Sequence, residues 1–271
     1  MQTISWNDAF VREEFAVLRR SRPFVYGLTN YVAASLSANV LLAVGAAPAI
    51  GAALDWPSCF AAGAGAVWIN GAALICCRPE TLRLAARSAR DAHRPWVLDP
   101  VAFGAGSPVY DEALRALLEF GPAVIRGNAS ELISLAGGPG AGKGVDTAAR
   151  SIDAVPYIRQ LARDTGAVVA VSGDVDYVTN GDVVSRIEGG DVRLTRVTGA
   201  GCSLGAFIAA LLAQSHSALN AACAAHAIFA LAAQQAASVR GTGSFAVAFV
   251  DALSELESEW PGAAAGESLD A

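Results

Sequence analysis

The stretch "PWVLDPVAFGAGSPVYDEALRALLEFGPAVIRGN", residues 95–128, contains a short apolar run, a helix-like segment and a second short apolar run. The runs "WVLD" (96–99) and "AVIRG" (123–127) have the length of buried strands, and residues 110–120 have the apolar spacing of a helix. A strand followed by a helix and another strand is typical of a parallel sheet, because the helix carries the chain back to the starting edge. The stretch therefore predicts an α/β fold.

The same alternation continues on both sides of this stretch. Further strand-like runs are "PFVYGL" (23–28), "AVWI" (66–69) and "AVVAVSG" (167–173), and further helix-like segments are 31–44, 79–92, 151–165, 202–213, 217–239 and 243–258. Two more runs flank Asn180-Gly181, a dipeptide that favours a tight hairpin. We therefore expect a mostly parallel sheet with helices on both faces, in a single domain over residues 1–260. Residues 261–271 are expected to be a disordered tail.

Composition and charge limit the kinds of partner. The chain has 271 residues, of which 54% are hydrophobic, but much of that fraction is alanine. A helix needs about 20 consecutive apolar residues to span a bilayer, and no uninterrupted apolar run in this sequence is that long. The formal net charge is -6, and the chain has no basic run that would suit nucleic acid. The first residues lack the apolar core of a signal peptide. We expect a cytoplasmic protein that binds small molecules, with no membrane or nucleic-acid partner.

Polar side chains follow the predicted strands at the point where each strand ends. They are Thr29-Asn30, Asn70, Asp99, Arg126 with Asn128, and Ser172 with Asp174. Ligands of an open parallel sheet bind at the carboxyl ends of its strands, so these groups are expected to meet in one crevice. Any one of them could simply begin a turn. Their repetition at five strands favours a binding site.

Two glycine-rich stretches could hold a phosphate. The first, "GGPGAGKG" (137–144), has the spacing of a phosphate-binding loop, but Gly144 stands where such a loop needs Ser or Thr and a helix-like segment precedes it. The second, "VTGAGCSLGAFIAALLA" (197–213), has glycines that let the backbone approach a ligand, and the helix after them attracts anions to its N-terminus. The second stretch is the better candidate, and the first is expected to be a flexible surface loop.

Cys202 lies at the predicted start of that helix. An unperturbed thiol has a pKa of about 8.5 and a helix N-terminus lowers it, so we expect Cys202 to accept a proton from a substrate hydroxyl. A cysteine taken alone is more often a packed residue, but the flanking glycines and Thr198 favour the catalytic interpretation. The other cysteines (Cys59, Cys76, Cys77 and Cys223) are expected to be small buried hydrophobes, and the histidines (His93, His216 and His226) to be surface or packing residues.

Several segments between Thr29 and Phe245 carry a resemblance to a known family. They are "TNYVAASLSANVLLAVGAAPA", "LDPVAFGAG", "IRGNASEL", "KGVDT", "VSGDVDYVTNG" and "VTGAGC". Together they resemble the hydroxyethylthiazole kinases, which belong to the ribokinase-like superfamily. The resemblance implies a three-layer α/β/α fold and transfer of a phosphoryl group from ATP, with Mg²⁺, to the primary hydroxyl of 4-methyl-5-(2-hydroxyethyl)thiazole in thiamine salvage. It also implies a homotrimer with active sites at the subunit interfaces.

The resemblance assigns roles to residues of this chain. Cys202 stands where many members of the superfamily have an aspartate as the base. The other implied roles are an anion hole of Gly199, Ala200 and Gly201, ATP contacts by Arg126 and Ser172, Mg²⁺ ligation by Asp99 and Glu131, and thiazole contacts by Asn30, Ile50 and Gly199. A carboxylate suits Mg²⁺ and an arginine fork suits phosphate oxygens, so the residue types agree with these roles.

Two departures from the family pattern concern the acceptor pocket. Ile50 replaces the usual Met, which keeps the pocket apolar, whereas Tyr26-Gly27 replaces His-Cys and changes both size and polarity. Two alternatives therefore stay open: another ribokinase-like kinase of a small alcohol, of the hydroxymethylpyrimidine or pyridoxal type, and a non-catalytic thiazole-binding protein. Cys202 argues against the first, and the set of Asp99, Glu131 and Arg126 argues against the second.

Overall fold

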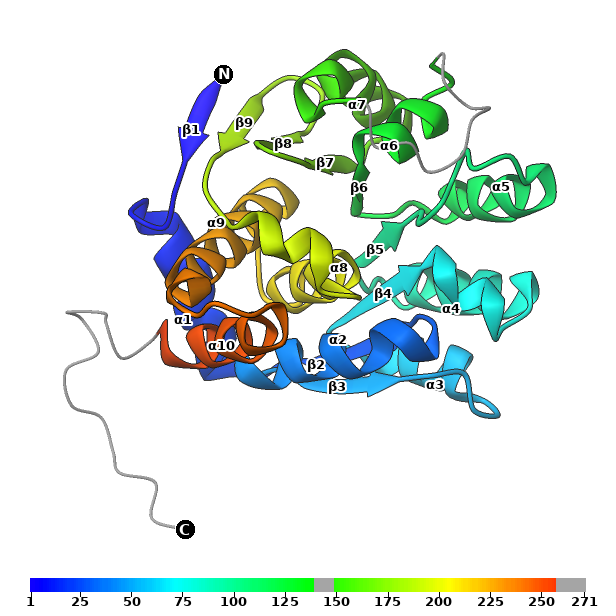
Figure 1. Cartoon of the computed structure of the whole chain (residues 1–271). Coiled ribbons are helices and arrows are strands. Elements are labelled where there is room, and N and C mark those ends of the chain that lie inside the picture. The colour runs from blue at the N-terminus through cyan, green and yellow to red at the C-terminus, as the bar shows by residue number, and fades with distance from the viewer. Residues whose placement is uncertain (139–148, 257–271) are drawn as a thin grey trace, which may run out of the picture.

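The strands form one sheet in a computed structural model that describes residues 1–138 and 149–256 (Figure 1). Their spatial order is β1-β9-β8-β7-β6-β5-β4-β2-β3. The strands are β1 (Gln2–Ile4), β2 (Phe24–Leu28), β3 (Ala47–Ile50), β4 (Ala66–Asn70), β5 (Trp96–Asp99), β6 (Val124–Asn128), β7 (Val168–Ser172), β8 (Asp176–Thr179) and β9 (Val184–Ile187).

The central part of the sheet is parallel from β3 to β7, while β8 runs antiparallel to both β7 and β9. Asn70 lies opposite Asp99 across β4 and β5, and Asn128 lies opposite Ser172 across β6 and β7. The carboxyl ends of these strands therefore meet at one edge. The turn between β8 and β9 contains Gly181 at φ +97°, a conformation that favours glycine, so the predicted hairpin is confirmed.

Helices cover both faces of the sheet, which gives the three layers expected from the sequence (Figure 1). The α-helices are α1 (Ala9–Ser21), α2 (Tyr31–Ala43), α3 (Trp56–Gly63), α4 (Pro79–Asp91), α5 (Pro108–Arg115), α6 (Ala129–Leu135), α7 (Ser151–Thr165), α8 (Ala200–Leu212), α9 (Ala218–Gln235) and α10 (Thr242–Glu255). The 3₁₀ helices are η1 (Gly71–Ile75), η2 (Ala116–Phe120), η3 (Val192–Arg196) and η4 (Ala236–Ser238).

Two apolar cores lie on the two faces of the sheet. One contains side chains of α1, α2, α8, α9 and α10, and the other contains side chains of α3 to α7. Alternate residues of a strand point to opposite faces, so Trp68 packs with the first core while Val67 and Ile69 pack with the second. Almost every residue of α8 is buried, as expected for a helix that is apolar on all sides.

The strands β1 and β3 are not predicted by the sequence pattern. β1 has three residues and pairs with β9, whereas β3, "APAI", contains Pro48 and lies at the other end of the sheet, where a proline is tolerated because no ladder hydrogen bond is lost. The predicted helix over 110–120 is divided into α5 and η2. Within the described ranges no helix is long and apolar enough to cross a membrane. The predicted disordered tail, 261–271, lies outside them.

Candidate active site

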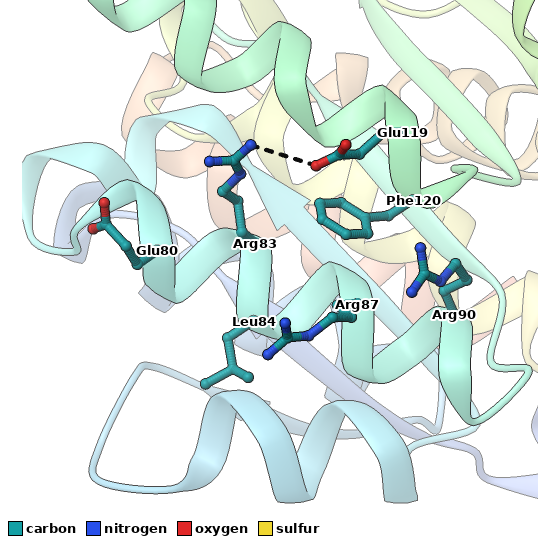
Figure 2. A pocket seen from close by; sticks show the side chains of 7 residues that line it. All are labelled: Glu80, Arg83, Leu84, Arg87, Arg90, Glu119 and Phe120. Carbon is teal, nitrogen blue, oxygen red and sulfur yellow. Dashed lines mark hydrogen bonds and ion pairs between the residues drawn. The ribbon is translucent and has the colours of Figure 1, made fainter.

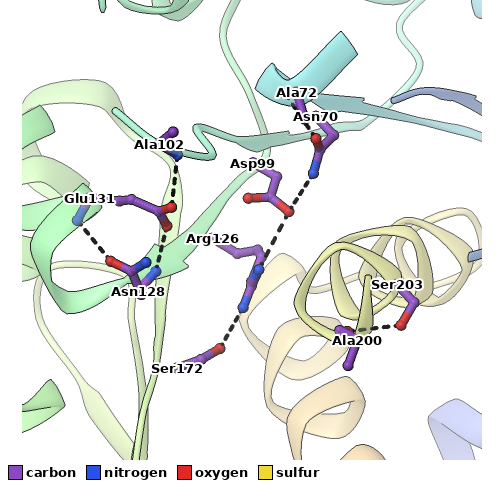
Figure 3. Close-up of polar contacts among 10 residues, drawn as sticks. All are labelled: Asn70, Ala72, Asp99, Ala102, Arg126, Asn128, Glu131, Ser172, Ala200 and Ser203. Atoms are coloured by element: carbon purple, nitrogen blue, oxygen red, sulfur yellow. Dashed lines mark hydrogen bonds and ion pairs between the residues drawn. The ribbon is translucent and has the colours of Figure 1, made fainter. Parts of the chain in front are cut away.

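Four polar side chains extend from the carboxyl ends of neighbouring strands toward α8 (Figure 3). Asn70 Nδ2 donates to Asp99 Oδ2 at 2.9 Å, and Arg126 Nη1 lies 3.4 Å from the same Asp99 oxygen. Arg126 Nη2 donates to Ser172 Oγ at 2.8 Å. Asn70, Asp99 and Ser172 end β4, β5 and β7, and Arg126 lies near the end of β6, so the expected convergence is confirmed for these four side chains. Asn128 instead caps α6, and Asp174 accepts from Ser151.

The N-terminus of α8 lies directly against this row of side chains. A Cβ atom on Gly201 would be 3.3 Å from Arg126 Nη1, and one on Gly205 would be 3.3 Å from Asp99 Oδ2. Gly199, at φ +85°, precedes the helix, and a Cβ there would be 3.2 Å from Ala33 Cα. The glycines therefore let the helix approach the arginine closely. The Ala200 amide donates to the Val197 carbonyl at 3.1 Å, whereas the next amides of the first turn have no partner within the helix and can bind an anion.

Asp99 is a fully buried carboxylate in the middle of the row. Burial raises its pKa to about 7, although the Arg126 guanidinium opposes the shift. Its Oδ1 atom has no hydrogen-bond partner among the described residues. A buried and unpartnered carboxylate oxygen is a suitable ligand for a hard cation such as Mg²⁺.

Glu131 is close enough to Asp99 to raise its pKa further, but its carboxylate already has backbone partners. Oε1 accepts from the Ala102 amide at 2.9 Å, and Oε2 accepts from the Asn128 amide at 2.8 Å as part of a capping box that begins α6. Each oxygen keeps a second lone pair, so contact with a cation through water is compatible with these bonds. The described residues contain no group of three or more acidic, histidine or cysteine side chains that could hold a metal on its own. Asp99 and Glu131 therefore suit a cation such as Mg²⁺, which binds one or two carboxylates of a protein and takes its other ligands from phosphate and water.

Cys202 lies in the first turn of α8 and is partly buried beside the row of polar side chains. Burial, followed by the nearby Asp99 carboxylate, raises the pKa of its thiol to about 11. The expectation of a lowered pKa is therefore wrong, because burial and this carboxylate both disfavour the thiolate. Cys202 is a neutral thiol near pH 7.

The predicted acceptor residues lie at the β2–β3 end of the site. Asn30 caps α2, where its Oδ1 accepts from the Ala33 amide at 2.8 Å, and Ile50 ends β3. Gly199 approaches Ala33 in the same first turn of α2. The structure thus brings Asn30 and Gly199 to one turn, with Ile50 on the adjacent strand.

The Tyr26-Gly27 departure has a structural explanation. Tyr26 points to the sheet face opposite α8, where its hydroxyl donates to the Gly51 carbonyl at 2.8 Å and its ring packs edge-on against Phe60. Gly27 faces the site, and a Cβ there would be 2.9 Å from Trp68 Cε3. The aromatic ring of Tyr26 therefore does not line the site, and Gly27 makes room for Trp68.

Gly27→Ala is expected to destabilise the fold by about 1–3 kcal/mol, the usual cost of overpacking a core, because Trp68 is fully buried and cannot move outward. Urea unfolding measures the effect. Gly63→Ala is the matched control, since nothing lies within 4 Å of the added Cβ, and it should leave the midpoint unchanged or slightly raised. Equal midpoints for Gly27→Ala and the wild type would show that Trp68 adjusts at no cost.

Other sequence expectations have mixed outcomes. Cys223 is buried and Cys77 partly buried, but Cys59 and Cys76 are exposed, so the expectation of buried cysteines is wrong for these two. Cys59 is on the outer side of α3, where its thiol contacts Asp55, and Cys76 follows η1 at the surface.

The histidines also divide. His93 and His216 are exposed and His226 is fully buried, which agrees with the expectation of surface or packing residues, but the pairing of His226 with Asp176 was not predicted. Most of the P-loop-like stretch (residues 139–144) and "KGVDT" (143–147) lie outside the described residues.

A hollow of about 450 Å³ opens on the surface between α4 and η2, away from this site (Figure 2). Its lining residues are Glu80, Arg83, Leu84, Arg87, Arg90, Glu119 and Phe120. Arg83 lies 3.4 Å from Glu119, and the Arg90 guanidinium stacks over the Phe120 ring. None of the predicted site residues lines this hollow, which we take as a charged surface groove.

A mostly parallel sheet whose carboxyl edge holds a buried Asp–Arg pair under a glycine-rich helix N-terminus is the arrangement of a ribokinase-like phosphotransferase. The model of the "Hydroxyethylthiazole kinase family" matches residues 15–259. The chain belongs to this family, and it is a kinase.

Individual relatives agree. A hydroxyethylthiazole kinase of Burkholderia thailandensis is 67% identical over 95% of this chain and 99% of the relative, and one of Leptospira interrogans is 45% identical over 94% and 96%. The solved structure of a hydroxyethylthiazole kinase protein from Pyrococcus horikoshii OT3 has a TM-score of 0.81 at 31% identity and covers 92% of this chain and 94% of its own. A Bacillus subtilis pyridoxal kinase, with a TM-score of 0.61 at 17% identity and coverage of 78% and 91%, shares the fold. The family and the ribokinase-like fold expected from the sequence are confirmed.

Proposed function

We propose that this protein transfers the γ-phosphoryl group of ATP to the primary hydroxyl of 4-methyl-5-(2-hydroxyethyl)thiazole, a salvage step for thiamine. The observation that carries this proposal is the buried pair of Asp99 and Arg126, 3.4 Å apart, beside Gly201 at the start of α8. Phosphoryl transfer depends mainly on positioning and charge neutralisation, and this pair, together with a helix N-terminus, provides both.

Arg126 and Ser172 are the proposed ATP contacts. Burial alone would lower the pKa of the Arg126 guanidinium, but Asp99 and Glu131 raise it above its ordinary value, so the charge is retained. Ser172 fixes one nitrogen of the fork at 2.8 Å, which limits how the guanidinium can rotate. An oriented fork beside the first amides of α8 suits the phosphate oxygens of a nucleotide.

Asp99 is the proposed direct ligand of Mg²⁺, and Glu131 would contact it through water. The bound cation would neutralise charge on the phosphates of ATP. The unpartnered Oδ1 of Asp99 supports the direct contact, and the two backbone hydrogen bonds of Glu131 support the indirect one.

Asn30, Ile50 and Gly199 are proposed to hold the thiazole. The Oδ1 atom of Asn30 is engaged by the Ala33 amide, so its Nδ2 is the group that can donate to the ring. Ile50 provides apolar contact for the ring. Gly199 would lie beside the reacting hydroxyl end of the acceptor.

Cys202 is proposed to line the anion hole with Gly199, Ala200 and Gly201 and to orient the acceptor hydroxyl. A thiol with a pKa of about 11 is a poor base near neutral pH, so its role is to touch and hold the hydroxyl while charge develops on the phosphoryl group. The thiol lies close enough to Asp99 for the carboxylate to raise its pKa.

Cys202→Ala is expected to lower kcat by about tenfold to hundredfold and to change the KM for the thiazole by less than about threefold, because it removes one positioned group from the transition state. Cys202→Asp should retain more activity than the alanine variant, since a carboxylate can accept the proton. Steady-state ADP release measures both, with Cys223→Ala on α9 as a control. Full activity of Cys202→Ala would remove the role, and a loss of about ten-thousandfold would restore the thiolate-base model.

A panel of acceptors tests the proposed reaction. The thiazole alcohol should exceed pyridoxal and hydroxymethylpyrimidine by at least about a hundredfold in kcat/KM, because the proposed acceptor residues offer an apolar contact at Ile50 and a single free amide donor at Asn30. A preference for pyridoxal or the pyrimidine would favour the related kinases. Thiazole binding without ADP release would favour the non-catalytic binding protein.

We also propose a cytoplasmic homotrimer, built from a single domain over residues 1–260, with active sites at the subunit interfaces. Large apolar side chains next to the acceptor residues are exposed, including Tyr31 and Leu54, and such groups favour a subunit contact. The ATP requirement supports the location, and the single sheet of the described residues supports the single domain. Light scattering should give the mass of three chains.

A further inference from the structure

A buried histidine on α9 is paired with an acidic side chain at the start of β8. His226 Nδ1 lies 2.6 Å from Asp176 Oδ2, and the His226 side chain is fully buried while that of Asp176 is 21% exposed. His226 Nε2 is buried and has no hydrogen-bond partner among the described residues. Buried polar atoms without a hydrogen-bond partner are uncommon in proteins, so the placement of this imidazole in the core, held by Asp176 alone, requires an explanation.

The same Asp176 carboxylate holds the turn between β7 and β8. Its Oδ1 atom accepts from the Gly173 amide at 2.8 Å, which closes the turn on the side of α9. On the other side, Ser151 Oγ at the start of α7 donates to Asp174 Oδ1 at 2.9 Å. The turn is therefore fastened from both of the helices that flank it.

Gly173 has little freedom to move between these contacts. A Cβ at Gly173 would lie 2.6 Å from Ser151 Cβ, so the backbone of the turn lies directly against α7. Asp176 and His226 hold the turn from the opposite face of the sheet, where α9 packs on β8. Loss of either support should let the turn shift.

Ser172, the residue before Gly173, connects this turn to the active site. Its Oγ atom accepts from Arg126 Nη2, and Arg126 Nη1 faces Asp99 (Figure 3). The Asp176 carboxylate is also close enough to contribute to the raised pKa of Arg126. A continuous series of contacts thus leads from His226 through Asp176, the Gly173 amide and Ser172 to the guanidinium.

We propose that His226 and Asp176 are positioning residues for the nucleotide: they fix the 172–176 turn so that Ser172 holds the Arg126 fork in the orientation that receives the phosphates of ATP. This inference rests on the proposed function. It predicts an effect on ATP alone, because the acceptor residues Asn30 and Ile50 lie at the β2–β3 end of the sheet while this turn follows β7.

The test begins with His226→Phe, which keeps a ring of similar size and removes both nitrogens. The KM for ATP should rise about tenfold, as expected when a hydrogen bond to a charged group is lost, and the KM for the thiazole should change less than about twofold. His226→Asn should recover most of the ATP affinity, because its Nδ2 can take the place of Nδ1. Asp176→Ala should raise the KM for ATP at least as much, because it also removes the acceptor of the Gly173 amide. The double variant should be no worse than Asp176→Ala, since His226 acts through Asp176.

Phe229→Leu is the matched control. Phe229 lies one turn along α9, is buried and packs against Phe207 and Phe249, so the variant should lower the unfolding midpoint and leave the KM for ATP unchanged. Should His226→Phe fail to fold, Asp176→Ala at its partly exposed position provides the same test. An unchanged KM for ATP in a folded variant, or an equal rise in both KM values, would overturn the proposal.

Exchange of the Gly173 amide separates this inference from the proposed function. The amide should exchange faster in His226→Phe and Asp176→Ala than in the wild type, whether or not the protein is active, because its acceptor is no longer held. Unchanged exchange would contradict the positioning role even if the kinase activity is as proposed. Faster exchange in the two variants, together with a wild type that releases no ADP, would support the turn contact and show that the proposed function is wrong.

Discussion

Asp99→Asn is expected to lower turnover of ATP by about a thousandfold, the largest effect of a single substitution in this site. The variant keeps the size of the side chain and removes the buried negative charge that faces Arg126 and whose Oδ1 is available to Mg²⁺. Steady-state ADP release in the presence of the thiazole measures the loss. Asp91→Asn, at an exposed carboxylate at the end of α4, is the control and should be fully active.

The pH dependence of the same residue provides a second readout. Burial raises the pKa of Asp99 to about 7 from an ordinary value of 3.8, so the carboxylate forms, and activity should rise, as the pH increases through about 7. Stability should change in the opposite direction, since a raised pKa in the folded state means that the folded protein holds a proton which the unfolded chain has released. The stabilising contribution is complete below the ordinary value and is lost as the pH rises through about 7.

Urea unfolding at several pH values isolates this contribution. The free energy of unfolding of the wild type, relative to Asp99→Asn, should decrease between about pH 4 and pH 7 with a slope that corresponds to about one proton. The other titratable groups are the same in both proteins, so their contributions to the pH dependence cancel when the two free energies of unfolding are subtracted. A difference that does not depend on pH would mean that Asp99 is ionised throughout this range and that burial does not control its charge.

Arg126→Lys is expected to lower kcat/KM for ATP by about a hundredfold, with less than about a threefold change in the KM for the thiazole. The planar fork contacts Asp99 with one nitrogen and Ser172 with another, and a Cβ on Gly201 would lie 3.3 Å from the nitrogen that faces Asp99. A lysine ammonium keeps the charge but cannot make both contacts in this geometry. The expected loss therefore measures the orientation of the charge.

Arg83→Lys is the control for this prediction. Arg83 lies in the surface hollow of Figure 2, is half exposed and pairs with Glu119, so its replacement should not affect the kinetics. If Arg126→Lys retained its ATP affinity within about threefold, the fork geometry would be unimportant and Arg126 would be a structural partner of Asp99.

The sequence was sufficient to predict the sheet and the row of polar side chains because both follow from local patterns. Short apolar runs that end in Asn70, Asp99, Arg126 and Ser172 predict strands whose carboxyl ends meet. Side chains alternate between the two faces of a strand, so Trp68 and Asn70, two residues apart in β4, both face α8. The sequence places Asn70 among the strand ends but assigns it no role, because its hydrogen bond with Asp99 depends on the neighbouring strand β5.

Features that depend on contacts distant in sequence could not be predicted. The raised pKa of Cys202 depends on its burial and on Asp99, about a hundred residues earlier in the chain, whereas the helix N-terminus is visible locally. The pairing of His226 with Asp176 joins a helix to a strand fifty residues away, and nothing around His226 in the sequence indicates a partner.

Thiazole-dependent release of ADP by the purified protein is the most direct test of the proposed reaction at the α8 N-terminus. With millimolar ATP and Mg²⁺, addition of 4-methyl-5-(2-hydroxyethyl)thiazole should produce ADP and the phosphorylated thiazole in equal amounts, and Asp99→Asn should reduce both together. Release of ADP that does not depend on the thiazole, or its absence from a folded protein that binds both ligands, would contradict the assignment.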